Sequence, residues 1–173
     1  GGRRVAATGW NRGGRSAAGR GDRYNPLMLL APHRGGAVGG RLAAELADVE
    51  ARFAAELHSD LGCVNTLVGH IERYRGKMLR PSLVLVTAAA VRPDVPEASE
   101  AHRVVATVVE MVHMATLVHD DILDEADVRR RGATINHLSG NEAAVMLGDY
   151  LISHAYHLCS ALADQRISRA IAA

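Results

Sequence analysis

Apolar residues recur every three or four positions along most of this chain, and this spacing strongly constrains the fold. The first series begins after Arg41 and comprises Leu42, Leu46, Val49, Phe53, Leu57 and Leu61. Residues at this spacing lie on one face of an α-helix, so the series predicts a helix that ends near Gly62. Alternation with a period of two and hairpin turn signals are absent, and we therefore predict an all-α fold.

The same pattern predicts the other helices. They are expected at 66–74, 81–91, 97–124 and 141–162, with a loop at 132–140. Pro81 fits the first turn of its helix, and the two prolines in 92–96 break the chain before the next one. Residues 97–124 form a nearly wholly apolar segment, and a helix that is apolar all round is buried.

The first forty residues differ in composition from the rest. The chain of 173 residues is 48% apolar, which allows a buried core, and its length suggests one domain. Residues 1–40, however, are rich in glycine and arginine, contain one acid, Asp22, and show no sustained apolar period. We predict a disordered arm at 1–40 and a helical domain at 41–173. The arm resembles RNA-binding arms and, vaguely, transit peptides, but we interpret it as a solvated tail and expect no nucleic-acid partner.

The cysteine and apolar content indicates a cytoplasmic protein. Cys63 and Cys159 lie far apart, and neither a signal-peptide pattern nor a metal-binding cysteine spacing is present. The longest mostly apolar run, 83–91, is too short to cross a bilayer. We therefore expect a soluble protein without a transmembrane segment.

Three carboxylates gather where the long apolar helix is expected to end. Asp120 and Asp124 are spaced i,i+4, and Asp121 and Asp124 are spaced i,i+3, so a helix would turn all three to one side. Acids at this end oppose the helix dipole and are costly unless they are paired or metal-bound. Mg²⁺ takes a few carboxylate oxygens and fills its remaining positions with water and phosphate, so the cluster predicts a magnesium-diphosphate site. The alternative is a solvated helix end.

Basic residues at two places supply donors for phosphate oxygens. Three arginines follow the acidic cluster at 129–131, and their planar guanidinium groups suit phosphate. Lys77 and Arg80 are three residues apart in a turn held by Gly76 and Pro81, so both cations can converge on one anion. Such a basic pair is by itself often only surface.

In this order, the motifs resemble those of the trans-isoprenyl (polyprenyl) diphosphate synthases, from about Arg41 to the end of the chain. The motifs are Gly76-Lys77-x-x-Arg80-Pro81, Glu110-Met111-Val112-His113, Asp120-Asp121-x-x-Asp124, Arg129-Arg130 and Gly148-Asp149-Tyr150. The resemblance implies a helical bundle of the isoprenoid synthase type. Family members carry a second aspartate-rich motif farther along, so the chain is expected to be the truncated N-terminal half of a synthase.

The resemblance implies roles for the acidic motif and the arginines after it. In the family, the first aspartate-rich motif binds Mg²⁺ on the allylic diphosphate, which implies this role for Asp120, Asp121 and Asp124. The first arginine after the motif contacts the allylic diphosphate and the second contacts the isopentenyl diphosphate. These positions correspond to Arg129 and Arg130.

The resemblance also implies a site for isopentenyl diphosphate, held by Lys77, Arg80 and His113. Two positions depart from the family pattern, because Arg75 and Arg131 stand where the family has glycine. Which two of the three arginines contact substrate is therefore left open.

The implied reaction is the head-to-tail addition of isopentenyl diphosphate to an allylic diphosphate after magnesium-assisted ionisation. In the family, side chains one turn before the first aspartate form the floor of the product cavity. Here they are Ala115 and Thr116, whose small size predicts a geranylgeranyl or longer polyprenyl product, although they could simply permit close helix packing. The fragment is expected to be inactive alone, and the full-length protein to be a homodimer, with a heteromer as the alternative.

Two other functions stay open. The chain could be a non-catalytic or partner-completed subunit of a heteromeric prenyl synthase. It could also be a metal-dependent phosphohydrolase built on His119 and Asp120, because His-Asp is a ligand dipeptide of such enzymes. No upstream histidine at a motif spacing is evident, so we interpret His119 as a helix-packing residue.

Overall fold

The computed structural model describes residues 37–71, 76–95, 97–130 and 132–172. The helices are α2 (Ala37–Leu57), α3 (Gly62–Ile71), α4 (Leu79–Val91), α5 (Glu100–Leu123), α6 (Ile135–Ser139), α7 (Asn141–Ser160) and α8 (Gln165–Ile171). The strands are β1 (Val128–Arg129) and β2 (Gly132–Ala133), which pair antiparallel. The predicted all-α class is confirmed, since this hairpin is the one sheet among the described residues.

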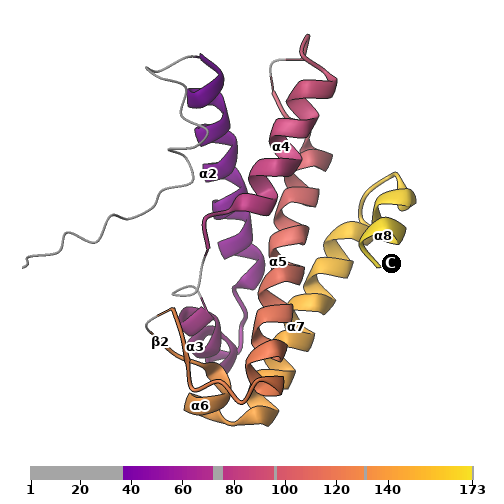
Figure 1. Ribbon diagram of the computed structural model, residues 1–173. Coiled ribbons are helices and arrows are strands. Elements are labelled where there is room, and N and C mark those ends of the chain that lie inside the picture. The colour runs from indigo at the N-terminus through magenta and orange to yellow at the C-terminus, as the bar shows by residue number, and fades with distance from the viewer. Residues whose placement is uncertain (1–36, 72–75, 96, 131, 173) are drawn as a thin grey trace, which may run out of the picture.

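Helix α5 is the centre of the bundle (Figure 1). Helices α2, α4 and α7 all pack against it, and the contact between α5 and α7 is the most extensive. Short helices α3 and α6 lie together at the end of the bundle where α5 finishes, and α8 packs against the far end of α7. The C-terminal end of α5 therefore lies beside the hairpin and α6.

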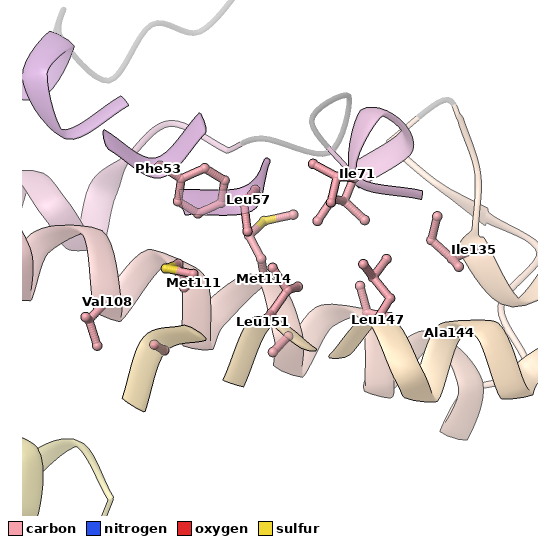
Figure 2. Close-up of a cluster of buried hydrophobic side chains, with 14 of the residues drawn as sticks. Phe53, Leu57, Ile71, Val108, Met111, Met114, Ile135, Ala144, Leu147 and Leu151 are labelled. Carbon is pink, nitrogen blue, oxygen red and sulfur yellow. The ribbon is translucent and has the colours of Figure 1, made fainter. Parts of the chain in front are cut away.

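The core lies between α2, α5 and α7 (Figure 2). Phe53 and Leu57 of α2 face Met111 and Met114 of α5, and Leu151 of α7 completes the cluster. All five side chains are at most 1% exposed, which places large apolar area away from water and stabilises the helix contacts. Burial of the long apolar helix is thus confirmed for this face.

Helix α5 as a whole is less buried than its apolar composition predicts. By length and composition, α5 is the one helix of the described residues that could cross a membrane, with a mean hydropathy of 1.2 over 18 residues. Half of that window is buried within the fold, as in the core helix of a soluble protein. The apolar helix at 97–124 was predicted from the sequence, but the expectation of no transmembrane segment rested on the shorter run at 83–91; cytoplasmic solubility stays a prediction.

Side-chain caps shift several helix boundaries from those predicted. Helix α5 begins after Ser99 rather than at 97, because the Ser99 hydroxyl accepts a hydrogen bond from the His102 amide while the His102 ring accepts one from the Ser99 amide. Helix α2 ends at Leu57, because the Asn65 side chain accepts from the Ser59 amide at 2.9 Å and donates to its carbonyl at 2.7 Å. Helix α3 consequently begins at Gly62, before the predicted start.

Two predicted features fall wholly or partly outside the described residues. The arm expected at 1–40 is described only from residue 37, where α2 has already begun, and the predicted end of the second helix at residue 74 is not described. The domain boundary at 40/41 therefore stays a prediction.

The predicted loop at 132–140 is wrong, because this segment contains β2 and α6. Two-residue strands and a five-residue helix are too short to show a period, so the sequence pattern missed them. The predicted absence of hairpins is wrong for the same reason. Helix α8 was also missed; it starts after Asp164, whose carboxylate accepts a hydrogen bond from the Arg166 amide at 3.0 Å.

Candidate functional site

The end of α5 presents two of its three aspartates to solvent. Asp120 and Asp124 are exposed one turn apart, and the Asp124 amide donates to the Asp120 carbonyl at 2.8 Å as the helix ends. Asp121 is only 3% exposed. Successive helix positions differ by about 100°, so the expectation of one shared face holds for the first and third carboxylates but not for Asp121.

Asp121 binds an arginine of the following hairpin. The Nε atom of Arg129 donates to Oδ1 of Asp121 at 2.6 Å. A hydrogen bond to a guanidinium group is stronger than one between neutral groups and satisfies the buried carboxylate oxygen. The pair therefore fixes β1 against the end of α5.

The residues after β2 hold the turn between α5 and the hairpin. The Thr134 hydroxyl donates to the Ala126 carbonyl at 2.6 Å, and Asn136 donates to the same carbonyl at 3.2 Å. The Thr134 amide donates to the Asp127 carbonyl at 3.0 Å. Neither side chain was predicted from the sequence, although a threonine directly before an apolar residue such as Ile135 is a helix N-cap signal that could have indicated Thr134.

The hairpin also reaches the basic turn before α4. A Cβ atom placed on Gly76 would lie 3.2 Å from Nη1 of Arg130, so this guanidinium group lies directly beside the glycine. Lys77 follows, and Arg80 lies in the first turn of α4, both exposed. The structure thus brings the two basic segments predicted from the sequence together.

His113 lies among these charges. Its pKa is lowered from the ordinary value of 6.5, first by burial and then by the positive charges of Arg80, Arg130 and Arg129, while Asp120 acts in the opposite direction. The imidazole is therefore held neutral over a wider pH range than a free histidine. The cations of two segments, α4 and the hairpin, and an aspartate of α5 therefore act on this one ring.

A cleft of about 510 Å³ opens beside His113. Its lining residues come from α4, α5 and α8 and are Arg80, Leu83, Val84, Val109, Val112, His113, Thr116, Ala170 and Ile171. The α5 residues of this lining lie on successive turns before Asp120, so the cleft follows the helix away from its acidic end.

The two predicted floor residues have different positions. Thr116 is exposed and lines the cleft, with its hydroxyl bound to the His113 carbonyl at 2.8 Å. Ala115 is 0% exposed and belongs to the core. The alternative considered for both residues was that their small size permits close helix packing. This alternative fits Ala115 but not Thr116.

The carboxylates fit a magnesium ion better than a closed metal cage. Within the part of the chain that the structure describes, no three His, Cys, Asp or Glu side chains converge to enclose a metal. Asp120 and Asp124 instead offer two exposed oxygen-donor groups one turn apart. Mg²⁺ is commonly bound by one or two carboxylates, with water and substrate phosphates as its other ligands.

Comparison with known proteins decides the family. Residues 63–173 match the family described as polyprenyl synthetase. The chain belongs to the polyprenyl synthetase family. It is similar to the octaprenyl diphosphate synthase of Escherichia coli (strain K12), with 35% identity over 125 residues that make up 72% of this chain and 38% of that protein. It is also similar to the heptaprenyl diphosphate synthase component 2 of Geobacillus stearothermophilus, with 34% identity over 131 residues, 76% of this chain and 40% of that protein.

The fold agrees with this family. The crystal structure of a decaprenyl diphosphate synthase from Rhodobacter capsulatus superposes with a TM-score of 0.67 and 32% sequence identity, over 76% of this chain and 39% of that one. The predicted isoprenoid synthase type of bundle is confirmed for the part present. This polyprenyl synthetase chain spans about two fifths of the length of the relatives that it matches.

Proposed function

We propose that this chain supplies one diphosphate-binding wall of a trans-polyprenyl diphosphate synthase, which adds isopentenyl diphosphate to an allylic diphosphate. The observation that carries the proposal is the position of His113, which lines an apolar cleft together with Arg80 and also feels the charges of Arg129, Arg130 and Asp120. Exposed Asp124 lies one turn beyond Asp120. Cations and carboxylates at the mouth of an apolar cleft suit a ligand with a charged head and a hydrocarbon tail. Membership in the polyprenyl synthetase family supports this choice of ligand.

The allylic diphosphate binds at the end of α5. Asp120 and Asp124 would hold Mg²⁺, which would neutralise charge on the diphosphate as its C–O bond breaks. Asp121, which is buried against Arg129, orients that guanidinium group toward the phosphates instead of binding the metal itself. Arg129 is thereby fixed before substrate arrives, and preorganised donors stabilise developing negative charge most effectively.

The isopentenyl diphosphate binds at the basic turn. Lys77, Arg80 and Arg130 would hold its phosphates, and neutral His113 would donate one N–H toward them. A neutral imidazole beside three arginines adds a hydrogen-bond donor without further repulsion among the cations. The apolar side chains of the cleft exclude water from the reacting carbons, which protects an allylic cation from hydrolysis.

The cleft supports a long product. Its side of α5 carries Val109, Val112 and Thr116, and no Phe, Tyr or Trp side chain stands among the lining residues. A geranylgeranyl or longer polyprenyl product fits this open floor. The similar octaprenyl and decaprenyl diphosphate synthases are consistent with such lengths.

A second candidate is a subunit that a partner chain completes. One relative is named as a component of a heptaprenyl diphosphate synthase, which favours this arrangement over a phosphohydrolase. We propose that the wall described here functions with an opposite wall that carries the second aspartate-rich motif, either within a full-length homodimer or supplied by a different chain in a heteromer.

The experiment is incorporation of labelled isopentenyl diphosphate into a farnesyl diphosphate starter, with Mg²⁺, by this chain alone and with a chain carrying the opposite wall. Chain growth is expected only in the combined sample. Phosphate release without growth in either sample would favour the phosphohydrolase and reject the proposal.

A further inference from the structure

The imidazole of His119 occupies the space above a glycine of the neighbouring helix. A Cβ atom placed on Gly148 would lie 2.1 Å from Nε2 of His119, 2.5 Å from Cδ2 and 2.8 Å from Cε1. Gly148 is buried within α7, where glycine is unfavourable to the helix itself. The close approach of the histidine ring gives the physical reason for glycine at this position.

Two polar groups of α7 lie near the Nε2 atom of the same ring. The Nε2 atom of His119 lies 3.4 Å from the Val145 carbonyl oxygen, a long hydrogen bond, and 3.7 Å from a carboxylate oxygen of Asp149. The His119 side chain is 31% exposed, and the Nε2 end of its ring is the part that lies against Gly148. The glycine therefore leaves room for this end of the ring beside the two acceptors of α7.

We propose that His119 is a positioning residue that orients Asp120 and Asp124 by locking the last turns of α5 to α7. This inference rests on the proposed function, because it assigns a role to those two carboxylates. Helix ends lack part of their backbone hydrogen bonds, so side chains there need support from outside the helix. His119 supplies that support one residue before Asp120, and the hydrogen bond from the Asp124 amide to the Asp120 carbonyl extends it to the third aspartate.

Substitution of His119 and Gly148, singly and together, distinguishes a packing role of His119 from a positioning role. His119→Ala removes the ring, and Gly148→Ala adds a methyl group where the ring lies. The double variant removes the clash but leaves α5 without its anchor. If His119 only fills space beside Gly148, the methyl group of the double variant should recover part of both the unfolding temperature and the Mn²⁺ affinity.

The experiment measures thermal unfolding and Mn²⁺ binding, the latter by electron paramagnetic resonance in the presence of inorganic pyrophosphate. Gly69→Ala is the matched control, because Gly69 is also a helical glycine but a Cβ atom there would meet nothing within 4 Å. His119→Ala should weaken Mn²⁺ binding about tenfold, as loss of groups that support metal ligands does. Gly148→Ala should lower both the unfolding temperature and the affinity, and Gly69→Ala should lower neither.

The double variant decides between the two roles. We expect it to regain unfolding temperature relative to Gly148→Ala while its Mn²⁺ affinity stays as low as that of His119→Ala. The positioning role would be overturned if the double variant regained both unfolding temperature and Mn²⁺ affinity, or if His119→Ala bound Mn²⁺ as tightly as wild type. In either case, Mn²⁺ binding by the wild-type chain would still support the proposed function. If the wild-type chain bound no Mn²⁺ with pyrophosphate, the proposed function would fail and this inference with it. Should Gly148→Ala not fold, the double variant is compared directly with wild type and His119→Ala, and a Mn²⁺ affinity restored to the wild-type value would overturn the positioning role.

Discussion

The Nε atom of Arg129 lies 2.6 Å from Oδ1 of Asp121 and joins the acidic end of α5 to the hairpin that follows it. Because of this contact, Asp121 is buried, whereas Asp120 and Asp124 are exposed. Three residues that read as one motif in the sequence thus have two different surroundings. Two face solvent as possible metal ligands, and one holds an arginine in place.

Asp121→Asn should destabilise the fold more than Asp120→Asn does. The first change replaces the buried anion beside the Arg129 guanidinium with a neutral amide, and hydrogen bonds to charged groups contribute up to about 1.5–3 kcal/mol. The second change affects an exposed group and should leave the free energy of unfolding nearly unchanged. Urea unfolding of the two variants measures the difference, and equal effects would show that the Asp121–Arg129 pair does not stabilise the fold.

His113 should make stability depend on pH below neutrality. Its folded-state pKa lies below the ordinary value of 6.5, so the unfolded state binds the proton more readily. Stability from this group is complete above pH 6.5 and is lost as the pH falls from there toward the folded-state pKa. The decrease in the free energy of unfolding at low pH should be smaller in His113→Gln than in wild type, as measured by urea unfolding at several pH values. A fall of the same size in both proteins would assign the pH dependence to other groups.

Thr116→Phe should shorten the product of the completed enzyme without unfolding it. The aromatic ring would enter the cleft from an exposed position, whereas Ala115→Phe would overpack the core at a cost of about 1–3 kcal/mol. Thr66→Phe, on the exposed surface of α3, is the matched control. Chromatography of the dephosphorylated products compares their lengths. An unchanged product distribution in Thr116→Phe would mean that this residue does not limit the chain.

Thr134→Val should loosen the turn that carries the arginines. It removes the hydroxyl that binds the Ala126 carbonyl and caps α6, and loss of a cap with its hydrogen bond typically costs about 1–2 kcal/mol. Thr134→Ser keeps the hydroxyl and should stay closer to wild type. Thr66→Val, which loses an exposed hydroxyl bond to Gly62, serves as the control in urea unfolding. Similar losses in Thr134→Val and Thr66→Val would contradict a special role for this turn.

The long helices could be predicted from the sequence because their buried faces repeat along many residues, as from Leu46 to Leu57 in α2. The hairpin and α6 could not, because their order depends on single contacts such as that of Thr134 with Ala126. Local caps, including Ser99, set boundaries that the apolar period places only within a few residues.

The residue types of the site were predictable, but their orientations were not. Helical spacing shows that Asp121 differs by one position from Asp120, yet only the fold shows which of them meets Arg129. Likewise, the assignment of Thr116 to the cleft and Ala115 to the core depends on where α4 and α7 pack against α5.

The most direct test of the proposed diphosphate site is calorimetric titration of this chain with inorganic pyrophosphate, with and without Mg²⁺, for wild type and for Asp120→Asn/Asp124→Asn. Wild type should bind pyrophosphate at least about tenfold more tightly with Mg²⁺, and the double variant should lose this enhancement while its unfolding temperature is unchanged. Equal binding with and without Mg²⁺ in wild type, or an undiminished enhancement in the double variant, would contradict a magnesium-diphosphate site at the end of α5.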